Sequence, residues 1–155
     1  MRLEVVRLGD PRVAPLLAGL EAEYLARYGP SEEMTRVGEG DFDPPAGLFV
    51  VAVDGAVTAA GGGFRGHEEG VCEVKRMWTA PAYRRQGLAE QVLDFLERAA
   101  RAAGYRRLVL ETGPRQGEAV ALYDKRGYGR IAAFGPYPEA VAFGLELTAG
   151  GGTAR

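Results

Sequence analysis

The strongest constraint on the fold is a strand, a helix and a second strand that follow one another over residues 71–110. Residues 71–79 have the composition of a strand, and Pro81 ends it. An amphipathic helix follows and runs to about Ala103, and Leu108-Val109-Leu110 is an uninterrupted apolar run typical of a central strand. A strand–helix–strand unit pairs its two strands in parallel through a right-handed crossover. The chain is therefore predicted to have an α/β fold with one parallel strand pair.

A basic turn joins the first of these strands to the helix. Its sequence is Arg84-Arg85-Gln86-Gly87-Leu88-Ala89. The unpaired N–H groups and the dipole at a helix start favour an anion, and a glycine lets the backbone approach that anion closely. The turn therefore predicts a site for a phosphate-bearing cofactor.

Further strands and helices are expected on both sides of this unit. The patterns predict a strand at 2–8, a helix at 10–28, a hairpin at 48–64 with a possible bulge at glycines 61–63, a helix at 116–126, and strands at 128–133 and 140–147. Because hairpin strands are antiparallel, we expect a mixed, mostly antiparallel sheet of about seven strands, with one parallel pair and helices on both faces. Residues 1–148 are expected to form a single domain and residues 149–155 a flexible tail.

Composition argues against several classes of protein. The 155 residues carry 19 basic and 21 acidic side chains, so we expect no nucleic-acid partner and no attraction to a membrane. The single cysteine, Cys72, is expected to be a buried, inert thiol in a reducing compartment. The single histidine, His67, is predicted to lie in a surface turn at 66–70, without the partners that a metal site needs. We expect a cytoplasmic protein that binds no metal.

Sequence motifs reduce the number of phosphate-bearing cofactors that the chain could bind. The chain contains neither G-x-x-x-x-G-K-[ST] nor G-x-G-x-x-G, which argues against a nucleoside-triphosphate loop and a dinucleotide site. Residues 74–89, VKRMWTAPAYRRQGLA, resemble the acetyl-CoA-binding motif [QR]-x-x-G-x-[GA] of the GNAT superfamily of N-acetyltransferases, with Arg84, Gly87 and Ala89 at its defined positions. Residues 119–128, AVALYDKRGY, resemble the family's A-x-x-L-Y-x-x-x-G-[FY] segment. The order of the elements also agrees with a GNAT-like fold.

The resemblance implies where acetyl-CoA would bind as cosubstrate. In GNAT enzymes the pyrophosphate lies on the turn and helix start, here the backbone of 85–90, and the pantetheine arm pairs with the strand before it. Gln116 stands where the family usually has Asn and is one methylene longer. The implied cofactor-binding residues are Met77, Trp78, Thr79, Arg84, Arg85, Gln86, Gly87, Leu88, Ala89, Glu90 and Gln116.

Acetyl transfer to an amine needs a proton acceptor, because an ammonium with a pKa of about 10 has no lone pair. Glu73 is the candidate base, with Lys75 on the same strand face as an ion-pair partner. Glu111 and a relay through water are the alternatives. The resemblance implies a backbone N–H near Trp78 as the oxyanion donor, and Tyr123 as the group that protonates the departing thiolate.

We therefore expect an enzyme that transfers an acetyl group from acetyl-CoA to a primary amine by direct attack on the thioester. The alternatives are a non-catalytic GNAT-like module that binds acyl-CoA as a sensor or partner-binding unit, and an enzyme with another donor such as succinyl-CoA. The small-molecule or peptide acceptor would contact Tyr24, Tyr28, the acidic segment at 31–47 and the loop at 134–138. A homodimer through edge strands is compatible with this fold by analogy.

Overall fold

The structure is a computed structural model that describes residues 1–30, 34 and 38–147. The expected tail at 149–155, with the last residue of the expected domain, lies outside the described residues. Residues 31–33 and 35–37 of the acidic segment also lie outside them.

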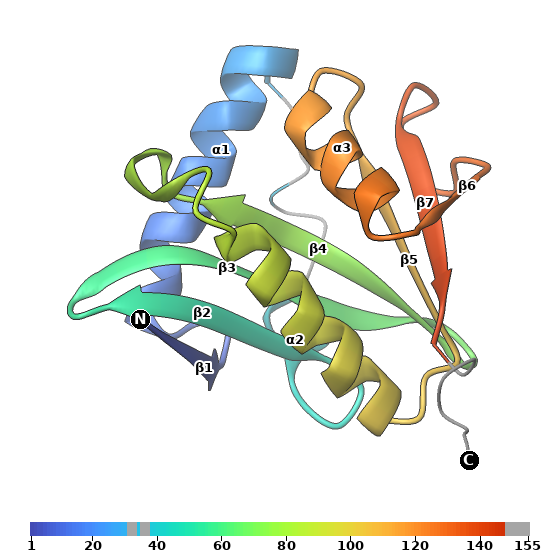
Figure 1. Ribbon diagram of the computed structural model, residues 1–155, viewed down its shortest axis with the longest axis horizontal. Helices are drawn as coiled ribbons and strands as arrows, with labels where there is room; N and C mark the ends of the chain where they lie inside the picture. Colours follow the sequence, from blue (N-terminus) through green and yellow to red (C-terminus); the bar gives the residue numbers. More distant parts are fainter. Residues whose placement is uncertain (31–33, 35–37, 148–155) are drawn as a thin grey trace.

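Seven strands form one sheet in the order β1-β2-β3-β4-β5-β7-β6 (Figure 1). Every neighbouring pair is antiparallel except β4 and β5, which are parallel. The predicted mixed, mostly antiparallel sheet with one parallel pair is therefore confirmed. In chain order, the elements are β1 Arg2–Val6, η1 Pro11–Val13, α1 Ala14–Tyr28, η3 Glu39–Phe42, β2 Leu48–Asp54, β3 Val57–Glu68, β4 Val71–Thr79, η4 Pro81–Tyr83, α2 Leu88–Ala102, β5 Arg107–Thr112, α3 Gly117–Lys125, β6 Gly129–Ile131 and β7 Val141–Glu146.

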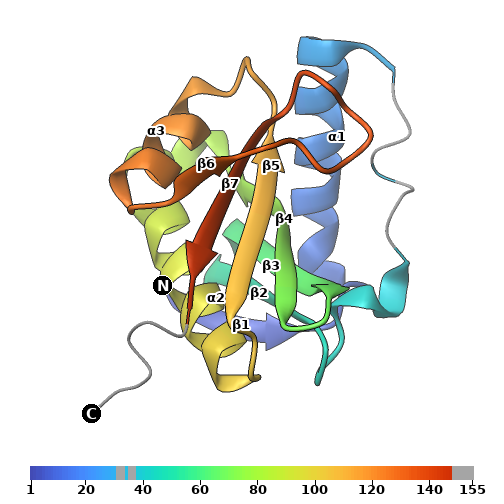
Figure 2. The same ribbon diagram turned by 90° about the vertical axis from the view of Figure 1, so that its right-hand side faces the viewer.

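Helices cover both faces of the sheet, as predicted. Figure 2 shows α1 on one face and α2 with α3 on the other. Strand β2 explains why both faces need a cover, because its residues alternate between two cores: Phe49 and Val51 pack toward α1, and Val50 and Ala52 pack toward α2. All four are fully buried. An apolar run without polar interruption is what a strand covered on both faces requires.

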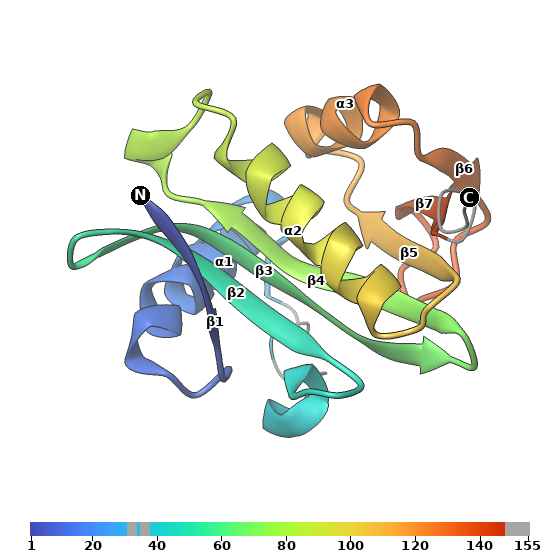
Figure 3. The same cartoon turned by 60° about the horizontal axis from the view of Figure 1, so that its bottom comes forward.

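Strand β3 is longer than predicted. It continues through His67 to Glu68, and the turn before β4 is formed at residues 69–70 (Figure 3). The prediction of a polar turn at 66–70 is therefore wrong for His67. Gly66 pairs with Cys72, and Glu68 pairs with Val71, so backbone pairing extends the hairpin although the side chains are polar.

Strands β4 and β5 part after a short parallel contact. Only Val71, Cys72 and Glu73 of β4 pair with β5, although β4 continues to Thr79. Figure 1 shows the two strands diverging, with β4 running toward the middle of α1 and β5 toward the start of α3. Farther along β4, Arg76 has a φ of 66°, and the register with β3 shifts between Gly61 and Gly63. This is a β-bulge, which turns the end of β4 away from its neighbour.

The glycines of β3 allow the close packing beside that bulge, and a matched pair of substitutions tests this. A Cβ at Gly63 would lie 2.5 Å from Phe49 Cδ2 and 2.7 Å from the Leu48 carbonyl oxygen. Gly63→Ala should therefore lower the free energy of unfolding by about 2–3 kcal/mol through overpacking. Gly117→Ala has no atom within 4 Å of its new Cβ and should change stability by less than about 1 kcal/mol. Equal urea midpoints for the two variants would contradict this account.

Candidate active site

A pocket of about 610 Å³ lies where β4 and β5 separate. The end of α1, both strands, the start of α3 and the segment before β7 supply its walls. It therefore brings together side chains that are far apart in the sequence. They include Tyr24, Glu73, Met77, Glu111, Tyr123 and Phe134.

The basic turn lies at the start of α2, as predicted. Gly87 is exposed, has a φ of 80°, and precedes α2 without a side-chain cap on the helix. The first N–H groups of a helix have no partner within the helix. The backbone from Leu88 to Glu90 is therefore suited to hold a phosphate group.

The two arginines of the turn have different surroundings. The Arg84 guanidinium donates to the Thr79 carbonyl oxygen at 3.1 Å and forms an ion pair with Glu23 of α1. It therefore fastens the turn to β4 and α1. The Arg85 side chain is 88% exposed, and its Nη2 lies 3.8 Å from a carboxylate oxygen of Glu118 on α3. Of the two, Arg85 is the side chain placed to meet a ligand on the surface of the turn.

The side chains at the end of β4 pack closely on α1 and β3. A Cβ at Gly19 would lie 2.5 Å from Trp78 Nε1, and a Cβ at Gly62 would lie 2.5 Å from Met77 Sδ. On the β5 side, the described residues give this part of β4 no strand partner. The contact between the cofactor and the backbone of Met77, Trp78 and Thr79, which the resemblance implies, stays a prediction.

Tyr123 lies in the wall of the pocket and is buried. Its ring centroid is 5.5 Å from that of Tyr128 and 5.4 Å from that of Phe143. Burial, with a smaller contribution from Tyr24, raises the pKa of Tyr123 well above its ordinary value of 10. Because its pKa is raised, Tyr123 carries its hydroxyl proton at neutral pH, and among the described residues no hydrogen-bond partner holds that hydroxyl.

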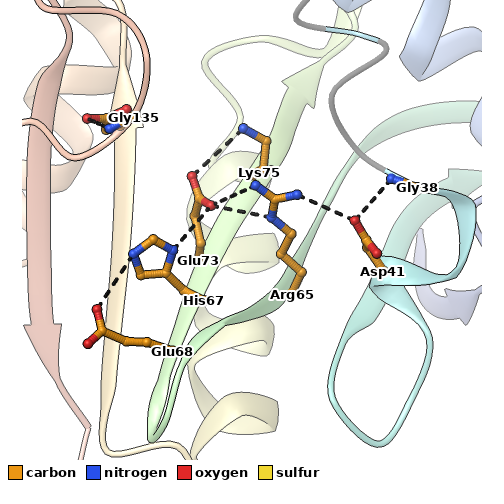
Figure 4. Close-up of polar contacts among 9 residues, drawn as sticks. Gly38, Asp41, Arg65, His67, Glu68, Glu73, Lys75 and Gly135 are labelled. Carbon is orange, nitrogen blue, oxygen red and sulfur yellow. Dashed lines mark hydrogen bonds and ion pairs between the residues drawn. The ribbon is translucent and has the colours of Figure 1, made fainter.

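The Glu73 carboxylate is buried among basic groups (Figure 4). Its Oε1 accepts from Arg65 Nε at 3.4 Å and from Arg65 Nη2 at 3.2 Å. Its Oε2 lies 3.8 Å from Lys75 Nζ, so the predicted ion pair with Lys75 is present. Both oxygens of this candidate base therefore face cations.

Arg65 also connects this cluster to η3. Its Nη1 donates to Asp41 Oδ2 at 3.4 Å, and the same oxygen accepts from the Gly38 N–H at 3.0 Å (Figure 4). The guanidinium therefore bridges a carboxylate on β4 and one in the segment before β2.

His67 lines the same pocket, which the sequence did not reveal. Its Nδ1 lies 4.0 Å from Glu73 Oε1, its Nε2 lies 3.8 Å from Glu68 Oε1, and its ring contacts Phe134 edge-on at 5.0 Å between centroids. The missing signal was the true end of β3. An extended strand through residue 68 would have placed His67 beside Glu73.

Glu111, the rival base, is engaged by backbone donors. Its Oε2 accepts from the Phe134 N–H at 2.7 Å and from the Gly135 N–H at 3.1 Å. A Cβ at Gly135 would collide with this carboxylate. Glu111 therefore fixes the path of the loop that forms one wall of the pocket.

Gln116 likewise supports a turn. Its Oε1 accepts from the Gly113 N–H at 2.8 Å and from Thr112 Oγ1 at 3.1 Å. The Tyr28 hydroxyl, from the end of α1, accepts from the Arg115 N–H at 3.3 Å in the same turn. The side chain expected to contact the cofactor therefore shapes the end of β5.

The single cysteine lies in the core of the protein. Cys72 is a buried free thiol, as predicted, and burial raises its pKa to about 12. Across residues 1–30, 34 and 38–147, no group of three His, Cys, Asp or Glu side chains is placed to hold a metal ion. No helix in that part of the chain is both long and apolar enough to cross a membrane.

Comparison with known proteins identifies the class. Residues 16–128 match the acetyltransferase (GNAT) family, and the chain belongs to this family of acyltransferases. It is 36% identical over 104 residues to a protein of Azospirillum brasilense named IAA acetyltransferase, a match that covers 66% of this chain and 68% of that protein.

Solved structures agree with this assignment. A putative acyl-CoA N-acyltransferase from Klebsiella pneumoniae is 28% identical, with a TM-score of 0.77 over 94% of this chain and 97% of that one. The PaiA N-acetyltransferase of Thermoplasma acidophilum, solved in complex with coenzyme A, shares the fold with a TM-score of 0.73 at 13% identity, over 94% and 99% of the chains.

The buried tyrosines should make the fold sensitive to alkali. Burial also raises the pKa of Tyr128, whose hydroxyl donates to Glu97 Oε2 at 2.7 Å. Above about pH 10 the unfolded chain loses tyrosine protons that the folded chain retains, so the stability they contribute is fully present below that pH and is lost as the pH rises further. In urea unfolding from about pH 10 to 12, Tyr123→Phe should reduce this decline by up to about 1.4 kcal/mol per pH unit. An unchanged slope would contradict the role assigned to burial.

Proposed function

We propose that the chain transfers an acetyl group from acetyl-CoA to a primary amine, by direct attack of the amine on the thioester. The parting of β4 and β5 beside Tyr123 is the observation that carries this proposal. Family membership supports acetyl transfer, and the relative named IAA acetyltransferase is consistent with it. The lone reduced thiol, Cys72, favours action in the cytoplasm.

In this proposal the start of α2 holds the pyrophosphate. The backbone from Arg85 to Glu90 supplies N–H donors, and Arg85 adds a charge-assisted contact. Arg84 contributes by holding the turn against Glu23 and Thr79. The surroundings fit an extended cosubstrate, because Gly87 leaves the helix start open and the backbone of Met77, Trp78 and Thr79 lies beside the gap.

Two groups of the chain are proposed to act on the reacting atoms. A backbone N–H near Trp78 donates to the carbonyl oxygen of the thioester as negative charge develops there. The Tyr123 hydroxyl gives its proton to the departing sulfur, and its burial keeps that proton in place at neutral pH. Acetyl-CoA, when bound, supplies the activated acyl group.

The surroundings of the two candidate bases favour the alternative in which the domain binds acyl-CoA without catalysis. Glu73 faces two cations and Glu111 accepts two backbone N–H groups. If neither accepts a proton and nothing replaces them, the domain would bind acyl-CoA without turning it over.

Calorimetry and a thiol-release assay separate these functions. Acetyl-CoA should bind to the purified chain, and one of four amines (phenylethylamine, lysine, kanamycin or a peptide with an unblocked N-terminus) should release coenzyme A in an enzyme-dependent manner. Binding without release would favour the sensor. Absence of binding would exclude both functions, and faster release from succinyl-CoA would assign a different donor.

Tyr123→Phe tests the proposed acid. Turnover should fall by about 100-fold or more, because general acid catalysis contributes on that scale. The dissociation constant of coenzyme A should change less than about threefold, since the aromatic ring and its contacts with Tyr128 and Phe143 remain. Equal turnover in the variant would remove Tyr123 from the mechanism, and a parallel loss of binding would make its role structural.

A further inference from the structure

We infer that His67, and not Glu73 or Glu111, accepts the proton of the attacking amine. This inference deepens the proposed acetyl transfer and rests on it. His67 was predicted to be a surface residue, and neither the two matched motifs nor the predicted site includes it. It nevertheless lies in the wall of the pocket that also contains Tyr123.

The first argument concerns Glu73. Arg65 donates hydrogen bonds from Nε and Nη2 to Glu73 Oε1, and Lys75 forms an ion pair with Oε2. Taking up a proton on Glu73 would weaken both ion pairs inside a largely buried cluster, where an unpaired cation is costly. The buried carboxylate is therefore better suited to orient a neighbour than to exchange protons.

The second argument concerns the imidazole itself. His67 lies on β3 next to Glu73 of β4, and its Nδ1 is 4.0 Å from Glu73 Oε1. Its side chain is 29% exposed, compared with 7% for Glu73, so a ligand in the pocket can reach it. Phe134 packs on the ring, and Glu111 holds Phe134 in place through its backbone N–H. The ring therefore packs against Phe134 and faces Glu73, while part of its surface stays exposed.

The tautomer follows from these neighbours. Glu73 is fixed by its cations, whereas the Glu68 side chain near Nε2 is 70% exposed. The fixed carboxylate favours a proton on Nδ1 and leaves the lone pair on Nε2. A carboxylate that orients a histidine base through its other nitrogen is an effective arrangement for proton transfer.

The proton balance closes with Tyr123. The ammonium first loses one proton to solvent, which frees its lone pair. As the amine nitrogen then bonds to the thioester carbon, His67 takes a second N–H proton. The carbon–sulfur bond breaks with its electron pair on sulfur, and Tyr123 gives that sulfur a proton. The imidazolium then returns a proton through solvent to the tyrosinate, so both side chains regain their starting states.

This assignment predicts a specific pH dependence. The charged groups around His67 are Arg65 and Glu68 on β3, Glu73 and Lys75 on β4, Glu111 on β5, and Glu139 on the loop that carries Phe134. Histidine is the side chain whose charge ordinarily changes between about pH 5 and 8. Protonation of the imidazole removes its lone pair, so turnover should fall on the acid side of that interval.

The kinetic test compares His67→Gln with Glu68→Gln, using phenylethylamine or whichever of the four amines the wild type acetylates fastest. His67→Gln should lower kcat by about 100-fold or more and abolish the acid limb, while coenzyme A binding and the melting temperature stay close to wild type. Glu68→Gln, which alters only the exposed neighbour, should stay within about twofold. Free imidazole should partly restore turnover to His67→Ala. An unchanged acid limb in His67→Gln, or no rescue of His67→Ala, would overturn the assignment.

A measurement on the wild type does not depend on how the variants fold. Because the chain has one histidine, a single imidazole signal reports on His67 in the NMR spectrum. Addition of the amine together with coenzyme A should shift this signal and its titration midpoint, and an unmoved signal would refute contact with the acceptor. If the wild type acetylates none of the four amines, the proposed function fails together with the inference. If the wild type is active and His67→Gln keeps the same pH dependence of turnover, the inference fails and the proposed function stands.

Discussion

The separation of β4 from β5 is the constraint around which the molecule is arranged. A sheet normally satisfies its backbone by pairing each strand on both sides, and strands that part leave N–H and C=O groups in need of other partners. Here the parallel contact ends at Glu73, and the bulge at Arg76 directs the rest of β4 away. The gap therefore has a hydrogen-bonding edge along one wall, and α1, α3 and the loop before β7 are placed around it.

The buried charges next to the gap depend on one another. Glu73 is tolerated in the interior because Arg65 and Lys75 compensate its charge, and Arg65 in turn is shared with Asp41. Removing Arg65 would take a counter-charge from Glu73 and from Asp41 at the same time. Three separate parts of the chain, β3, β4 and η3, are consequently joined by ion pairs beside the pocket.

The sequence predicted the architecture well because local signals agreed with the global fold. The periodicity of α2, the apolar run at Leu108-Val109-Leu110 and the Asp54-Gly55 hairpin each identified a correct element. The sequence predicted that β4 and β5 pair. It did not predict that their pairing ends at Glu73, because the length of a strand contact depends on tertiary packing. The end of β3 was missed because the polar run 66–70, with a glycine at each end, resembles a turn. The ion pair of Arg84 joins residues 61 positions apart, which no local pattern encodes.

The contact between Glu111 and Gly135 has a consequence for how the pocket can diverge. The carboxylate holds the backbone of this loop, and any side chain at position 135 would displace it. The neighbouring residues Pro136 and Tyr137 are exposed and also line the pocket. Substitutions at these two positions would therefore change the lining of the pocket, while Glu111 keeps the backbone of this wall in place.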